Sequence, residues 1–155
     1  MEQSQIENVL KGCEFFKEIE DSTIKEIAKI CKTKSYENGS CVFRQGDFGE
    51  NLYVIADGRI FLERATDLGT RKGRVVIETL GKGRVLGCWS TLLGECHNLM
   101  SSAVCQQPTE VVVMKGAELR DLMLSDLNIG FKVLERFCYL LRNRIIAAYG
   151  VMDKV

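Results

Sequence analysis

The chain has 155 residues, 46% of them hydrophobic, which suits one domain built around a single buried core. Its 21 basic and 21 acidic residues cancel, so no net charge draws it to nucleic acid or to an anionic membrane surface. The polar first residues lack the apolar run of a secretory signal, and no apolar stretch approaches the roughly 20 residues that span a bilayer. We therefore expect a cytoplasmic protein with no membrane partner.

The N-terminal segment shows helical periodicity. Apolar residues recur at helical spacing over residues 3–31, first at Ile6 and Leu10 and again after Asp21, which is a suitable helix cap. We predict that residues 1–34 form a helical cap that packs onto the segment that follows.

A different pattern begins at Ser35. Ten of the fourteen glycines fall between Gly39 and Gly94, where they separate short runs of β-forming residues. The predicted strands cover residues 41–43, 52–55, 60–62, 75–77, 85–86, 102–104 and 111–114. Many short strands with turns about every 8–12 residues predict an antiparallel roll over residues 35–114. Residues 67–74 are expected to form an exposed hairpin tip.

Helical periodicity returns in residues 115–155. Residues 117–123 predict a short helix, and Asp126 is placed to cap a long helix from about Leu127 to Met152. Apolar residues along that helix step by four and three, the heptad spacing that packs a helix against a copy of itself. The seam consists of Leu134, Cys138, Leu141, Ile145, Ala148 and Met152. We expect a homodimer through this seam; the alternative is one broad apolar stripe that packs on the β-roll.

The order of these elements resembles the cyclic-nucleotide-binding domain of catabolite-activator-type and FNR-type regulators. The most specific matches are Gly39, then Gly46 and Asp47, then the run from Leu52 to Gly58. The resemblance covers about residues 10–150. It implies a mainly β fold with flanking helices, an antiparallel double-stranded β-helix or jelly roll followed by a long C-terminal helix. It also implies a single domain with a regulatory role and no enzymatic activity.

The family's phosphate-binding cassette aligns with the turn at Gly87. In the family a Gly-Glu pair opens a short helix whose amides favour phosphate; the Glu binds the ribose, and a later Arg pairs with the phosphate. Here Cys88 stands at the Glu position, and Leu99 or Met100 stands at the Arg position. We expect no tight binding of ordinary cAMP or cGMP, because both charged contacts are missing.

No nearby residue replaces the missing arginine. The sequence contains no arginine between Arg84 and Arg120, and Lys115 alone carries a fixed positive charge there. We therefore predict a pocket that holds no cation to bind a phosphate.

The resemblance places a ligand pocket between the β-core and the long helix. The residues expected to line it are Gly87, Cys88, Trp89, Ser90, Met100, Ser101 and Ser102. Tyr139, Arg142 or Asn143 is expected to approach from the long helix. Two functions stay open: a sensor for a small-molecule ligand, and a ligand-free module for dimerisation or docking. The role of Trp89 also stays open: it either stacks on a ligand or fills the core.

Cys88, Cys96, His97 and Cys105 lie within eighteen residues, and cysteine and histidine are ligands of soft metals and haem. Cluster-binding relatives carry closely spaced N-terminal cysteines, whereas this chain has Cys13 alone there. The seven cysteines are odd in number and irregular in spacing, which indicates separate buried thiols. We expect no haem, no iron–sulfur cluster and no other cofactor, and leave open whether these four residues bind a metal.

DNA binding in this family uses a domain that follows the long helix. The present sequence ends at Val155, directly after that helix, so we expect no direct contact with DNA. The basic residues Lys132, Arg136, Arg142 and Arg144 are interpreted as solvated charge near the end of a helix.

Overall fold

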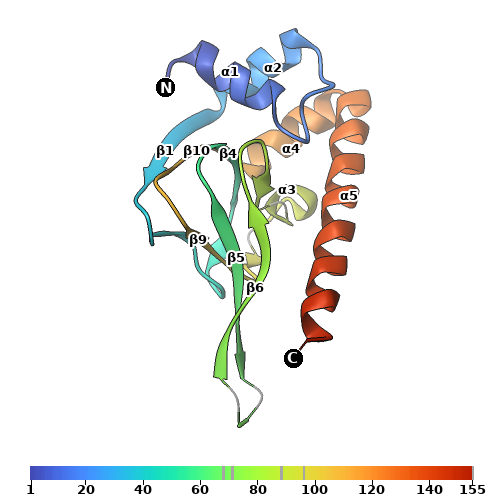
Figure 1. Ribbon diagram of the computed structural model, residues 1–155. Coiled ribbons are helices and arrows are strands. Elements are labelled where there is room, and N and C mark those ends of the chain that lie inside the picture. Colours follow the sequence, from blue (N-terminus) through green and yellow to red (C-terminus); the bar gives the residue numbers. More distant parts are fainter. Residues whose placement is uncertain (68, 71, 88, 96, 155) are drawn as a thin grey trace.

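The computed structural model describes residues 1–67, 69–70, 72–87, 89–95 and 97–154. Antiparallel strands form a roll, two N-terminal helices cover one end of it, and the long C-terminal helix runs along one side (Figure 1). The helices are α1 (Gln3–Lys11), α2 (Asp21–Lys29), α3 (Trp89–Leu93), α4 (Gly116–Ser125) and α5 (Leu127–Met152). The strands are β1 (Cys31–Tyr36), β2 (Cys41–Phe43), β3 (Phe48–Gly49), β4 (Asn51–Asp57), β5 (Ile60–Asp67), β6 (Lys72–Leu80), β7 (Val85–Leu86), β8 (His97–Asn98), β9 (Ser102–Cys105) and β10 (Thr109–Lys115). This confirms the predicted mainly β fold with flanking helices and a long C-terminal helix.

The strands within the described residues form two four-stranded sheets and one two-stranded sheet. Their orders are β1-β10-β4-β7, β2-β9-β5-β6 and β3-β8, with every pair antiparallel. The first sheet is buried on both faces: Leu52 and Val54 of β4 pack against the cap helices, whereas Ile55 packs inside the roll. That sheet therefore separates a helical core from a β-core.

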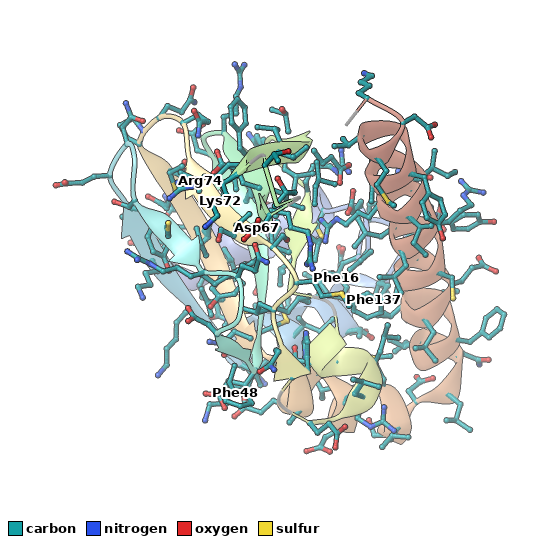
Figure 2. All side chains as sticks on the ribbon, turned by 90° about the horizontal axis from the view of Figure 1, so that it is seen from below. Phe16, Phe48, Asp67, Lys72, Arg74 and Phe137 are labelled. Carbon is teal, nitrogen blue, oxygen red and sulfur yellow. The ribbon has the colours of Figure 1, made fainter. Side chains whose placement is uncertain are left out.

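The helical core joins both ends of the chain. Phe15 and Phe16, between α1 and α2, are buried, and the ring of Phe15 lies 4.3 Å from that of Phe137 on α5 in an edge-on arrangement. Figure 2 shows Phe16 and Phe137 close together, with Phe48 at a distant edge of the roll. The first half of α5 is thus held against the cap by aromatic packing.

The long helix begins as predicted. The carboxylate of Asp126 accepts hydrogen bonds from the amides of Asn128 and Ile129, which satisfies two otherwise unpaired helix donors. The buried residues of α5 are Gly130, Val133, Phe137 and Leu140, all within its first fourteen residues. Past Leu140, no described residue of the helix is buried.

Two details of the prediction were wrong. Strand β1 begins at Cys31, so the predicted boundary at residue 35 lies inside a strand. Cys31 was assigned to the helix because it follows Ile27 at helical spacing, four residues later. Its thiol does donate to the Ile27 carbonyl, 3.2 Å away. Its backbone, however, pairs with Met114 of β10. The short strands β3 and β8 were also missed, because two residues carry no periodicity.

Of the predicted hairpin tip, residues 68 and 71 lie outside the described residues.

Membrane insertion through a helix was also considered. Within the described part of the chain, no helix combines the length and apolar character that crossing a bilayer requires.

We predict that Phe137→Ala lowers the free energy of unfolding by about 3–5 kcal/mol, because it removes a fully buried ring and leaves a cavity in the core. Phe48→Ala is the matched control, because that ring is 78% exposed, and its effect should stay within about 0.5 kcal/mol. Urea denaturation followed by circular dichroism measures both. Equal losses for the two variants would contradict the packing role of Phe137.

Candidate functional site

A cavity of about 740 Å³ lies between the roll and the second half of α5. Its lining residues come from β2, β5, β6, the segment around Gly87, the segment 99–101 and α5. They are Phe43, Leu62, Arg64, Thr66, Val75, Ile77, Gly87, Leu99, Met100, Ser101, Leu141, Arg144, Ile145, Ala148, Val151 and Met152. The cavity therefore occupies the place where the resemblance put a ligand, between the β-core and the long helix.

The structure brings three of the seven predicted ligand residues to this cavity. Gly87, Met100 and Ser101 line it. Cys88 lies outside the described residues, as does the side chain of Trp89, so the predictions for both stay open.

The remaining two predicted residues, Ser90 and Ser102, do not line the cavity. The buried hydroxyl of Ser90 donates to the carbonyl of Gly87 over 3.0 Å, which closes the turn into α3. The hydroxyl of Ser102 accepts from the amide of Gln45 over 2.9 Å. Both side chains therefore hold the cassette in shape instead of facing a ligand.

Gly87 is required by the geometry of the turn. Its φ is +79°, and a Cβ atom built on it would lie 2.3 Å from the carbonyl oxygen of Asn51. A residue with a side chain would strain the backbone at this φ and would also collide with β4. The close approach of the cassette to the roll therefore depends on this glycine.

The cassette helix is joined to the C-terminal helices. Arg120 of α4 donates to the carbonyl of Leu92, 2.8 Å away, near the end of α3. At Gly116, the first residue of α4, a Cβ atom would lie 2.5 Å from the hydroxyl of Ser90. These contacts tie α3 to α4, which continues through Asp126 into α5.

The prediction of a pocket without a cation was wrong. Arg64 of β5 and Arg144 of α5 both line the cavity. The sequence prediction placed Arg142 of the long helix near the pocket, but not Arg64 or Arg144, which reach it from segments distant from the cassette. Strand alternation was the available signal for Arg64, because Leu62, Arg64 and Thr66 project from one face of β5.

Arg144 belongs to a chain of ion pairs that ends at the cap. Its Nε lies 3.3 Å from Glu78 of β6, and its Nη2 donates to the carbonyl of Val85. Glu78 in turn pairs with Arg84 over 2.7 Å, and Arg84 pairs with Glu14 over 2.7 Å. Burial raises the pKa of the Glu14 carboxyl above its usual value, although Arg84 and Arg144 act to lower it. Two arginines thus face two carboxylates, and their charges balance.

Two of the basic residues on α5 form ion pairs, whereas we expected all four to be solvated. Arg144 is only 19% exposed, and Arg136 forms an ion pair with Glu18 over 2.6 Å. The pKa of Glu18 is lowered, mainly by the hydrogen bond from Arg136. Two of the four basic residues therefore attach the helix to the rest of the chain.

The three residues of the long helix that we expected near the pocket lie elsewhere. Arg142 lies over the exposed ring of Tyr139, 5.1 Å from its centre, and bonds to the side chain of Asn143. None of these three lines the cavity. Four residues of the predicted dimer seam line it instead: Leu141, Ile145, Ala148 and Met152. The other two, Leu134 and Cys138, are exposed.

The four residues considered as metal ligands are only partly described, since Cys88 and Cys96 lie outside the described residues. His97 is in β8, and burial lowers its pKa; Cys105 is in β9 of a different sheet. Among the described residues, no group of three or more His, Cys, Asp or Glu is placed to hold a metal ion.

The sequence matches a known family over the roll and α4. The family model described as cyclic nucleotide-binding domain matches residues 33–126. The chain is 30% identical over 105 residues to the cyclic AMP receptor protein of Thermus thermophilus, which covers 68% of this chain and 46% of that protein. It is 25% identical over 123 residues to cGMP-dependent protein kinase, isozyme 1, of Drosophila melanogaster, which covers 79% of this chain and 15% of that protein. The chain spans less than half the length of each of these relatives.

Structural comparison agrees on the fold. A crystal structure of a cyclic nucleotide-binding domain from Methylobacillus flagellatus matches with a TM-score of 0.78 and 20% identity, covering 99% of this chain and 84% of that one. At this identity the likeness concerns the arrangement of helices and strands.

We predict that Gly87→Ala lowers the free energy of unfolding by about 2–5 kcal/mol, because strain at positive φ adds to the collision with Asn51. Gly81→Ala is the matched control, since Gly81 has no positive φ and a Cβ atom there meets nothing within 4 Å. Its effect should stay within about 1 kcal/mol. Chemical denaturation of the two variants compares them directly, and a Gly87→Ala variant as stable as the control would refute the proposed constraint.

Proposed function

The chain belongs to the cyclic nucleotide-binding domain family, whose members are regulatory, and we propose that it is a ligand-sensing domain for a molecule other than an ordinary cyclic nucleotide. The observation that carries the proposal is the cavity of about 740 Å³ beside the cassette, walled on one side by α5. A volume of this size falls within the range of small-molecule sites in proteins.

The altered cassette argues against an ordinary cyclic nucleotide. The names of the relatives refer to cAMP and cGMP, but here the family's Glu and Arg positions hold Cys88 and, in one alignment, Met100. Met100 lies at the cavity and is 63% exposed, and a thioether does not replace the paired donors of a guanidinium. The missing contact between the family's Glu and the ribose alone costs about 1.5–3 kcal/mol of binding energy.

The position of α5 provides a route from binding to signal. The half of the helix that lines the cavity has no buried residue, and Arg144 attaches it to β6 through Glu78. A ligand that fills the cavity would contact both the roll and this half of the helix. Binding would then favour one placement of α5, which is the change of population that a sensor needs.

A second candidate function is a ligand-free module for dimerisation. Large apolar side chains on α5 are exposed: Leu127, Phe131, Leu134, Ile145, Ile146, Tyr149 and Met152, between 40% and 73%. Such a face is costly to leave in water and suits a second copy of the helix. We propose a homodimer through this face in either function, and the two functions differ in whether a ligand changes it.

We predict that Leu134→Glu converts the dimer into a monomer, because it places a charge in the seam at a residue outside the cavity. Asn143→Glu is the control, since residue 143 lies on the opposite side of the helix from residue 134. Sedimentation equilibrium should give the mass of one chain for the first variant and of two chains for the second. A dimer that survives Leu134→Glu would exclude this seam.

We predict that a ligand raises the melting temperature of the wild-type protein and does so much less in Ala148→Trp, where the indole occupies part of the cavity beside α5. At a concentration one hundredfold above Kd, the gain should be about 2.7 kcal/mol. The panel contains cAMP, cGMP, other nucleotides and small apolar anions, and Asn143→Trp serves as the control on the exposed side of α5. A panel without any shift would favour the ligand-free module.

A further inference from the structure

We propose that Arg64 binds the head group of the ligand, and that the ligand is a small amphipathic anion with an apolar body and one carboxylate. This inference rests on the proposed ligand-sensing function and specifies the class of molecule that the cavity accepts.

The lining of the cavity is mostly apolar. Eleven of its sixteen residues have aliphatic, aromatic or thioether side chains, and one is Gly87. The polar ones are Arg64, Thr66, Ser101 and Arg144, and the hydroxyl of Thr66 already donates to the carbonyl of Gly73, 3.3 Å away. The several hydroxyls of a bound sugar would lose their water and find few partners in this lining, which opposes binding. The lining therefore favours a ligand whose body is apolar.

Of the two cavity arginines, Arg64 alone has an uncompensated charge. Arg144 is balanced by Glu78 within the chain of ion pairs. Among the described residues, no carboxylate forms an ion pair with Arg64. One unpaired guanidinium matches a single negative charge, as on a carboxylate or a phosphodiester, better than a phosphate monoester with nearly two. The apolar lining then favours a carboxylate on an apolar body over the diester of a sugar.

Arg64 also lies where the family expects a positive charge. Its Nη1 donates to the carbonyl of Met100 over 2.5 Å, and Met100 is one of the two candidates for the position of the family's arginine. The bond fixes the guanidinium at the cassette and leaves other N–H donors for a ligand. Ser101 follows directly in the cavity wall and offers a hydroxyl beside it. The missing charge is thus supplied from β5, the strand that pairs with β9 just after Ser101.

This placement orients the ligand. With the carboxylate at Arg64, the apolar body extends between β6, at Val75 and Ile77, and α5, at Ile145 and Ala148. The head group then contacts the roll and the body contacts the helix. An anion of this kind therefore bridges the two parts whose relative position would carry the signal.

The test compares acids with neutral alcohols of the same shape, by isothermal titration calorimetry on the full chain. Octanoate with octan-1-ol and 4-phenylbutyrate with 4-phenylbutan-1-ol represent acyl and aromatic bodies. We expect the better acid to bind ten- to hundredfold more tightly than its alcohol, the range for a charged hydrogen bond. Arg64→Met should remove this preference by weakening the acid alone, and Arg64→Lys should restore part of it.

Arg74→Met is the matched control. Arg74, labelled in Figure 2, lies on the neighbouring strand β6. It pairs with Glu63 at 3.9 Å and does not line the cavity. This variant should bind acid and alcohol as the wild type does. Because Arg64 and Arg74 are both exposed, neither change should prevent folding, and melting curves without ligand verify this.

The outcomes separate this inference from the proposed function. Equal affinity for acid and alcohol would overturn the role of Arg64 but leave a ligand-binding cavity. Tighter binding of cAMP than of either acid would overturn the ligand class. Binding of none of these compounds would overturn both the ligand class and the sensor proposal.

Discussion

The unequal attachment of α5 is the constraint on which the rest of the structure depends. Its first half is held by buried side chains, with Phe137 packed on Phe15 of the cap. Its second half has no buried residue and is held to the roll by Arg144, through Glu78 and the Val85 carbonyl. Apolar packing over a large area resists movement more than one ion pair and one hydrogen bond do. The first half of the helix is thus held by more contacts than the second half, which lies beside the cavity.

The charged groups beside the cavity act as one unit. Glu14, Arg84, Glu78 and Arg144 come from the cap, a turn, a strand and a helix, yet their ion pairs are continuous. Partial burial makes each charge depend on its neighbours, and the raised pKa of Glu14 shows that the arginines do not fully offset this cost. If α5 moved away from β6, Glu78 would keep Arg84 but lose one of its two partners. The network therefore holds this part of the helix against β6.

Glycines determine how closely the cassette, α4 and α5 pack against one another. Gly87 permits the turn against β4, and Gly116 permits contact between Ser90 and the start of α4. At Gly130 a Cβ atom would lie 2.7 Å from the carbonyl oxygen of Met123, so α4 and α5 also meet at close range. Such close approaches leave little room for adjustment at the glycines. They join the cassette to α4, and α4 to α5.

Local pattern determined the elements of this protein: the Asp126 cap, the long helix, most strands and the turn at Gly87 all depend on residues close together in the sequence. The family resemblance added the place of the pocket. Only the tertiary structure decided what lines it, because side chains from separate strands converge through pairing and register. Arg64 reaches Met100 across thirty-six positions, and Arg144 reaches Glu78 across sixty-six. Strand alternation indicates which face of β5 carries Arg64, but periodicity along one segment does not say which distant residues meet on that face.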